Sequence, residues 1–342
     1  MSELRRNLLT AMNKAEPPIT KDYLTIVALE DGLTAKLSLN ACEYCVDGDG
    51  NWKSLPANTE TETVNAGQTL SFRGNLSPDS TNGIGIFTVN RLHNLKGNCM
   101  SLLFGDNGKN IFSLAGKYAS FTELFKNNVG LINACELKLP ATTLVENCYK
   151  SMFASCKNLI TPPELPAKTL KSYCYYTMFS GCSSLKKAPR LSATILANNC
   201  YCYMFNKCSS LVEVSELPAT VLSTSCYGGM FANCVSLTKA PDLPATTLAG
   251  NCYSDMFNNT GLIEAPALPA LTLMAYCYQN MFMSCANLNY IKMLATDISA
   301  NGCLNNWVYS VPSTGIFIKN NDATWSVRGA SGIPNGWEVV AE

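Results

Sequence analysis

The stretch NCYSDMFNNTGLIEAPALPA, residues 251–270, decides the fold because its pattern recurs along the chain. Earlier copies read NCYKSMFASCKNLITPPELPA from residue 147 and TSCYGGMFANCVSLTKAPDLPA from residue 224. A period between about 20 and 50 residues indicates a solenoid, because each unit leaves its apolar face open until a neighbour covers it. The first cysteine of the pattern returns at intervals of 26 residues, or 25 once, at Cys148, Cys174, Cys200, Cys226, Cys252, Cys277 and Cys303.

Each repeat divides into two segments of different character. In 144–156 the apolar residues recur at offsets 0, 4, 5, 8, 9 and 12, and at about 100° per residue they form a wide stripe on one side of a helix. The following segment, LITPPEL (159–165), is short and rich in proline, which predicts a short extended strand. The sequence therefore predicts an α/β repeat solenoid of the leucine-rich-repeat type, with short parallel strands on one side and short helices on the other.

The chain outside the regular repeats predicts three further parts. Residues 1–20 form an N-terminal arm, and 21–96 alternate apolar pieces with Gly, Asn and Asp turns, which predicts a small antiparallel β domain. The solenoid of about 26 residues per repeat spans 97–303. Residues 304–342 lack the repeat and are predicted to form a C-terminal β cap, because an uncapped sheet would expose its last apolar layer.

Composition excludes several classes of function. Lys plus Arg and Asp plus Glu each number 25 among 342 residues, so no net charge favours nucleic acid or an anionic membrane as a partner. His93 is the single histidine, which leaves little room for histidine-based catalysis. No apolar run reaches the length of about 18 residues that a membrane span needs, and the apolar piece after Arg5 and Arg6 is too short for a signal peptide. We therefore expect no membrane insertion and no export by that route.

The 17 cysteines raise the question of metal or redox chemistry. Seven lie at the first position of the repeat, and five lie at a second position: Cys156, Cys182, Cys208, Cys234 and Cys285. Stacked side chains point in the same direction, which disfavours disulfides between coils, and the repeats contain no histidine and no pair of Cys-x-x-Cys motifs at zinc spacing. We predict buried, inert thiols, with a few disulfides as the alternative, and neither metal nor cofactor.

Two local motifs near the N-terminus resemble metal sites. Cys42 and Cys45 form the only Cys-x-x-Cys, but residues three apart on a strand face opposite sides. DGDGN (47–51) resembles the start of a calcium loop, yet Trp52 stands where that loop needs glycine and Asn58 where it needs glutamate. A hairpin turn is the favoured interpretation.

Charged residues recur at two positions after the strand leucine. In the first column the sign alternates over four consecutive repeats, which favours register through pairing of opposite charges between neighbouring strands. The same columns face the exposed side of the predicted sheet, where a binding solenoid would meet its partner, and the two roles are compatible. The candidate binding residues are Thr161, Lys187, Glu213, Lys239, Glu264 and Tyr290 in the first column and Glu164, Arg190, Glu216 and Asp242 in the second.

The repeat Met-Phe-x-x-Cys-x-x-Leu-x-x-Ala-Pro-x-Leu-Pro resembles that of BspA-type leucine-rich-repeat surface proteins of Bacteroidales, over about residues 97–303. The repeat departs from that family's usual pattern in three ways. Its 26-residue period is longer, methionine precedes the phenylalanine, and proline stands where the family often has a β-branched residue. The resemblance implies an adhesin or binding surface and carries no catalytic residues. The start MSELRR with its β-rich continuation is also similar, over a short stretch, to structural proteins of phages that infect those bacteria.

From these features we expect a non-catalytic binding or adhesion protein that presents its repeat surface to a protein or glycan on a cell surface, with host-cell recognition as one role. The alternative is a phage virion structural or tail-appendage protein that binds a receptor. Either role places the protein outside the cell, on a cell surface or a virion. The variable triplets before each first cysteine, such as 145–147 and 171–173, fit an exposed surface without shared chemistry, and no catalytic constellation supports an enzyme.

Overall fold

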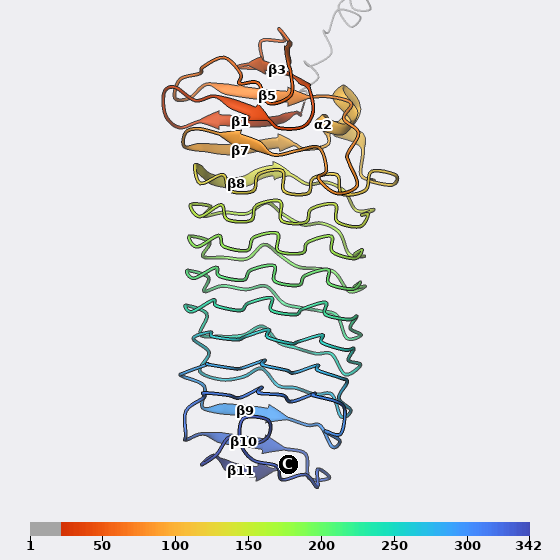
Figure 1. The fold of residues 1–342 in the computed structure, drawn as a ribbon, viewed down its shortest axis with the longest axis vertical. Coiled ribbons are helices and arrows are strands. Elements are labelled where there is room, and N and C mark those ends of the chain that lie inside the picture. Colours follow the sequence, from red (N-terminus) through yellow and green to blue (C-terminus); the bar gives the residue numbers. More distant parts are fainter. Residues whose placement is uncertain (1–21) are drawn as a thin grey trace, which may run out of the picture.

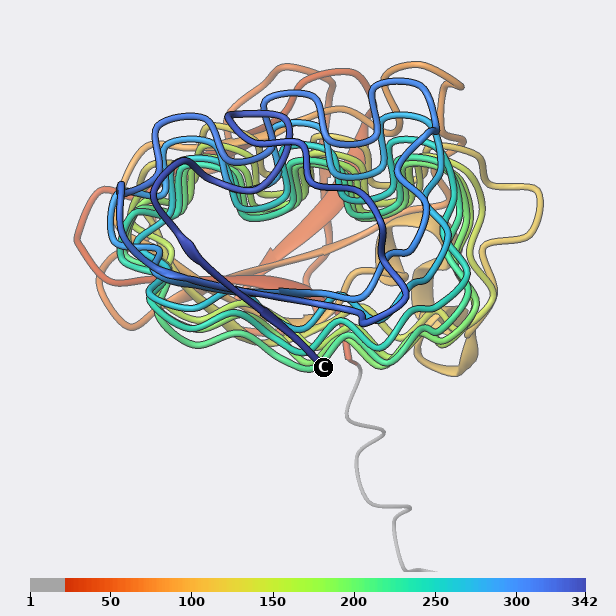
Figure 2. The same ribbon diagram turned by 90° about the horizontal axis from the view of Figure 1, so that it is seen from below.

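The structure of the protein, a computed structural model, describes residues 22–342. The predicted arm, 1–20, lies outside the described residues. The chain winds into a column of stacked coils, with the N-terminal sheet at one end and β9, β10 and β11 at the other (Figure 1). Seen along the column, one wall of each coil folds in deep, regular bends and the opposite wall is flatter (Figure 2). We call these the turn wall and the sheet wall.

The N-terminal end is a six-stranded sheet with the order β4-β3-β5-β1-β7-β8. Its neighbours pair antiparallel except β7 and β8, which are parallel, so β7 joins the antiparallel strands to the stacked coils. The predicted boundary between residues 96 and 97 thus falls inside a strand. The strands are β1 (Leu24–Ala28), β3 (Cys42–Val46), β4 (Lys53–Leu55), β5 (Thr69–Arg73), β7 (His93–Asn98) and β8 (Leu131–Lys138), and a separate pair is formed by β2 (Ala35–Leu37) and β6 (Phe87–Val89).

The sheet wall continues from β8 to the C-terminal end. Between β8 and β9 the coils are joined by isolated parallel bridges, for example Leu165 to Leu191 and Thr169 to Ile195, which are 26 residues apart. Pro163 and its equivalents lack the N–H group that a continuous ladder needs, which explains why the pairing is limited to single bridges. The wall ends in a parallel three-stranded sheet of β9 (Tyr290–Met293), β10 (Ile316–Lys319) and β11 (Glu338–Ala341).

The turn wall is a series of β-turns, and the predicted helix over 144–156 is wrong. Residues at every fourth position have positive φ, as at Asn147 (57°), Ser151 (54°) and Ser155 (61°). A positive φ at the third residue of a turn defines a type II turn and is incompatible with an α-helix. In the described part of the chain the only helices are α2 (Ser101–Phe104) and the 3-10 helix η1 (Gly105–Asn110), both before the regular repeats.

Hydrogen bonds on the turn wall alternate between the coil itself and its neighbour. The amides of Lys150 and Met152 donate to carbonyls three residues earlier in the same turn, at 3.1 and 3.2 Å. The alternate amides, those of Tyr149 and Ser151, donate to the carbonyls of Cys174 and Tyr176 in the next coil at 3.0 and 2.9 Å. Every second amide therefore links two coils, so the wall satisfies its buried backbone without helix or ladder.

The prediction of an α/β solenoid of the leucine-rich-repeat type is therefore wrong, because both walls of the coils consist of extended segments and turns. The physical reason lies in the period of the apolar residues. Tyr149 with Phe153 and Cys148 with Met152 are four residues apart, and a four-residue turn unit repeats every four residues. A short helix of 3.6 residues per turn accommodates the same pattern over three turns.

The core consists of two aromatic columns that run along the solenoid. Tyrosine rings stack at centroid distances of 5.7–6.1 Å from Tyr149 to Tyr278, and phenylalanine rings at 5.5–5.8 Å from Phe125 to Phe282. Both columns end at Trp307, whose ring lies 6.4 Å from Tyr278 and 6.0 Å from Phe282. Trp307 occupies the methionine position of the last coil and is fully buried, so one large side chain covers the ends of both columns.

Candidate functional site

The ten predicted binding residues lie on the sheet wall in two columns. The first column is joined by parallel bridges between Lys187 and Glu213, Lys239 and Glu264, and Glu264 and Tyr290. Its charged members are exposed, whereas Tyr290 is half-buried and Thr161 is half-buried and hydrogen-bonded to Asn133. All four residues of the second column, Glu164, Arg190, Glu216 and Asp242, are exposed.

Pairing of opposite charges between coils is limited to one contact among these ten residues. Lys187 and Glu213 form an ion pair at 3.0 Å with 73% and 64% of their side chains exposed. An ion pair this exposed contributes at most about 1 kcal/mol. Lys239 and Glu264 face each other across a bridge without an ion pair, so these columns add little to stability and leave most of their charges available to a partner.

The two columns meet at a groove where the sheet wall is irregular. Ser215 occupies the position that holds Pro189 and Pro241 in the adjacent coils, and its hydroxyl accepts a hydrogen bond from the Leu191 amide at 3.1 Å. Leu268 is the equivalent of Leu191 three coils further on, and its amide instead donates to a backbone carbonyl, that of Lys292. Neither Leu217 nor its equivalent Leu243 forms a bridge to a neighbouring coil, and a groove whose lining includes Ser215 lies over this part of the wall.

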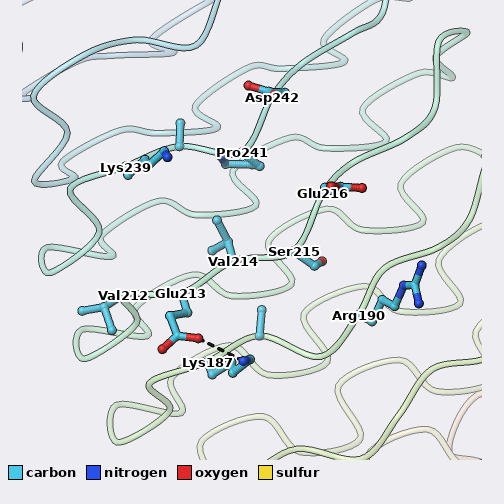
Figure 3. A pocket seen from close by; sticks show the side chains of 12 residues that line it. Lys187, Arg190, Val212, Glu213, Val214, Ser215, Glu216, Lys239, Pro241 and Asp242 are labelled. Carbon is cyan, nitrogen blue, oxygen red and sulfur yellow. Dashed lines mark ion pairs between the residues drawn. The ribbon is translucent and has the colours of Figure 1, made fainter.

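The groove presents charges of both signs (Figure 3). Three cationic and three anionic side chains line it over three coils. The Lys187–Glu213 pair lies at one side and Arg190 and Glu216 extend from the other, with Val214 between them and Val212 beyond Glu213. A second depression continues from Arg190 and Glu216 to Glu164 and Lys168, which lie in the coil before Arg190. The charged residues of the groove are Lys187, Arg190, Glu213, Glu216, Lys239 and Asp242.

The thiols of the repeat are placed for packing. All 17 cysteines are free, and 16 of them are buried, with Cys135 as the exposed one. Burial raises the pKa of Cys148, Cys200 and Cys252 to about 12, so these thiols stay protonated and unreactive at neutral pH. At the second cysteine position of the repeat, the Cys182 thiol donates to the Phe153 carbonyl of the preceding coil at 3.1 Å.

The coil that lacks the second cysteine shows what that position requires. Thr260 is buried, and its hydroxyl donates to the Phe257 carbonyl at 2.9 Å. A hydroxyl thus replaces the thiol as a small donor to a core carbonyl. A small side chain with a hydrogen to donate therefore suffices at this position, and the column needs no thiol chemistry.

His93 is buried within β7 and does not reach the groove on the sheet wall. Its Nδ1 lies 2.8 Å from the Arg91 carbonyl, and its Nε2 has no partner. Burial lowers the pKa of His93 to about 4, so the imidazole is neutral at physiological pH. The neutral, enclosed ring of His93 thus packs within the N-terminal sheet, away from the groove.

The two motifs that resemble metal sites form ordinary strand and turn structure. Cys42 and Cys45 lie on β3, which pairs antiparallel with β4, and 47–51 form the turn between these strands. Asp49 accepts a hydrogen bond from the Asn51 amide at 2.8 Å, as in an Asx turn. Over residues 22–342 no group of three or more His, Cys, Asp or Glu side chains is arranged to hold a metal ion.

Comparison with known proteins yields no relative: no family model, no curated protein and no solved structure matches the chain. Among the helices that the structure describes, none has the length and apolar character needed to cross a membrane. The function must therefore be argued from the surface of the solenoid itself.

Two features of this surface were missed by the interpretation of the sequence. Ser215, in place of a proline, was not recognised as part of a groove, although the interrupted proline column was visible in the sequence. Of the tyrosines Tyr173, Tyr176 and Tyr203, only Tyr173 was expected at the surface, within the variable triplet 171–173. The turn structure instead places them at the tips and floor of the turn wall.

Proposed function

We propose that the protein is a non-catalytic binding protein whose sheet wall recognises a partner on a cell surface. One observation carries this proposal: exposed, variable charges are aligned over an invariant core and are gathered into a groove at Ser215. The core is formed by residues that repeat from coil to coil, whereas the two exposed columns change at almost every coil. A surface of this kind varies its contacts without altering the fold.

The chemistry of the groove favours a protein as the partner at this wall. Three cations and three anions within one groove complement a surface that itself carries both signs, and such complementarity gives specificity and speeds association. A uniformly anionic glycan would be attracted to Arg190 and Lys239 but repelled by Glu213, Glu216 and Asp242. A glycan partner is the other outcome that the test must distinguish.

The proposed location is extracellular, on a cell surface or a virion, and its support is the resemblance of the repeat to BspA-type surface proteins. A virion structural or receptor-binding role remains the alternative proposal. It predicts that the protein is incorporated tightly into a particle, with attachment through residues 1–20.

The test is binding of the labelled full chain to intact bacteria and to a glycan array, before and after the cells are treated with protease. The double variant Lys187→Glu/Glu213→Lys keeps the ion pair but reverses the local field. We expect it to weaken cell binding by about tenfold while the free energy of unfolding stays unchanged. The control is Lys157→Glu, an exposed charge change outside the groove.

Loss of binding after protease treatment would support a protein receptor, and persistence with a matching array signal would indicate a glycan. The proposal of adhesion is contradicted if neither cells nor glycans are bound while the protein is incorporated into a particle. Unchanged binding by the double variant would contradict a role of the groove in contacting the partner.

A further inference from the structure

The turn wall lies opposite the sheet wall, which bears the charged columns (Figure 2). It carries a depression of different chemistry. The depression spans several coils between the tips of successive turns. Its walls are polar and aromatic and include Tyr173, Tyr176, Tyr203, Asn199, Ser225 and Asn251, and its floor includes Cys202, Gly228 and Ser254.

The depression exists because the floor position loses its side chain in one coil. This position, two residues after the first cysteine, holds Lys150, Tyr176, Cys202, Gly228, Ser254 and Gln279 in successive coils. Cys202 is small and buried and Gly228 has no side chain, so a gap opens between Tyr176 and Ser254. In the adjacent position Gly229 allows the Tyr203 ring to approach the backbone of the next coil closely.

The tyrosine rings are held in defined orientations. Tyr173 and Tyr176 meet edge to face, with centroids 5.5 Å apart and an interplanar angle of 65°. Tyr173 is 39% exposed, and Tyr176 and Tyr203 are half-buried. Aromatic side chains anchored in this way offer a large contact area at a small cost in conformational entropy.

The polar groups of the depression are available to a ligand. Within the described residues, the hydroxyls of Tyr173, Tyr176 and Tyr203 and the side chains of Asn199, Ser225 and Asn251 form no hydrogen bond. Burial raises the pKa of both Tyr176 and Tyr203, so their hydroxyls remain protonated donors at neutral pH.

Charged groups stand beside the depression but do not line it. Lys150 Nζ lies 5.8 Å from the centroid of the Tyr176 ring. The Asp255 carboxylate, near Tyr203, accepts hydrogen bonds from Ser254 and Asn258 at 2.9 and 3.1 Å. The residues that line the depression are therefore neutral, and charged side chains, among them Lys150, Glu146 and Asp255, lie around it.

We propose that this depression binds a neutral oligosaccharide. A pyranose ring has apolar C–H faces that pack on aromatic rings and a rim of hydroxyls that exchange hydrogen bonds with amides and hydroxyls. The depression supplies both kinds of group and no charge that would need a counterion. Tyr, Asn, Ser and Gly are also the residues that dominate adaptable recognition surfaces. The site lies on the opposite wall from the charged groove, so one chain has two distinct binding surfaces.

The test is affinity electrophoresis of the full chain in native gels that contain mannan, xylan, laminarin, dextran or galactan. We expect at least one of these neutral polysaccharides to retard the protein. Gly228→Leu fills the floor of the depression at a position where an added Cβ meets only ordinary contacts of 3.4 Å or more. Tyr203→Asn removes one ring and retains a residue suited to positive φ.

Each of these two variants should weaken the retardation by about tenfold or more. Tyr203→Asn removes an aromatic anchor, the kind of residue whose truncation dominates losses at binding sites, and Gly228→Leu occupies the space that the ligand would fill. The matched control is Gln279→Leu, which introduces the same residue at the same turn position two coils further on. It should bind as the wild type does, and so should Lys187→Glu/Glu213→Lys. Thermal unfolding of each variant verifies the fold, and Tyr203→Asn serves as the test if Gly228→Leu does not fold.

The inference is overturned if none of the five polysaccharides retards the protein, or if retardation persists in both Gly228→Leu and Tyr203→Asn. Cell binding that depends on Lys187 and Glu213 but not on Gly228 would contradict this site and leave the sheet-wall proposal intact. The reverse pattern would support this site and contradict the other.

Discussion

The ring of Tyr203 lies against the backbone of Gly229 in the next coil, so closely that a Cβ added to Gly229 would lie 2.1 Å from Cε1 of the ring. The same relationship recurs between Tyr276 and Gly302, with 2.4 Å to the equivalent atom. Within each pair the tyrosine and the glycine occupy equivalent turn tips of neighbouring coils. Both glycines have positive φ, 58° at Gly229 and 60° at Gly302. In these two pairs a tyrosine at one tip is accompanied by glycine at the equivalent tip of the next coil.

This relationship predicts a strong coupling between the two positions. Gly229→Asn should destabilise the protein by about 2 kcal/mol, because asparagine accepts positive φ but its Cβ collides with the Tyr203 ring. In the Tyr203→Asn background the same substitution should cost less than about 0.5 kcal/mol, as at Asp255 and Asn280 in the following coils. Urea unfolding of the double-mutant cycle measures the coupling, and additive effects would contradict the proximity of the two residues.

Trp307 is predicted to be the most sensitive core position at the C-terminal end. Trp307→Ala should destabilise the protein by about 3–5 kcal/mol, since it exposes the ends of both aromatic columns. Because each coil contacts only its neighbours, the loss of amide protection should be largest in the last coils and decline towards β8. Hydrogen exchange measures this gradient. Trp307→Phe is the control and should show a smaller loss, and a uniform loss along the chain would contradict the nearest-neighbour picture.

The thiols provide a test of core burial. Ellman's reagent should modify about one thiol per native chain, because Cys135 is exposed and the other 16 cysteines are buried. Under denaturing conditions all 17 should react. Cys135→Ser should abolish the native reaction. Several fast-reacting thiols in the native protein would show that the column is accessible, and fewer than 17 on denaturation would show disulfides.

His93 predicts a specific dependence of stability on pH. Its pKa is about 4 in the folded chain and 6.5 in the unfolded chain, so between these values the unfolded state binds a proton that the folded state does not. The contribution of His93 is complete above about pH 6.5 and is lost as the pH falls to about 4, in total roughly 3 kcal/mol. His93→Asn should give a flatter curve of unfolding free energy against pH over this window. Parallel curves for the two proteins would contradict the burial of a neutral imidazole.

Some features of the fold could be predicted from the sequence and others could not. The spacing of the first cysteines equals the length of a coil, and Leu159 and its equivalents lie in the core as the repeat implies. The helix failed because 144–156 is too short to separate a period of 3.6 from one of 4. The residues at the turn tips held the missing signal: Asn147, Asn199, Asn251 and Gly229 are poor helix formers and tolerate positive φ.

The candidate site followed the same division. The two charged columns could be identified because equivalent residues of a solenoid lie side by side. The groove could not, because the hollow between three neighbouring coils depends on local backbone geometry. The depression on the turn wall could not be predicted either, because it depends on the turns that stand in place of the predicted helix.

The central claim is that the repeated segment is a series of turns with positive φ, and Asn280 tests it most directly. Its φ is 53°, its side chain is half-buried, and it lies outside both proposed binding surfaces. Urea unfolding of Asn280→Gly and Asn280→Ala compares the two. In a turn with positive φ the glycine variant should be more stable by about 1 kcal/mol, whereas in a helix the alanine variant should be more stable by a similar amount. A more stable Asn280→Gly supports the turn wall, and a more stable Asn280→Ala would contradict it.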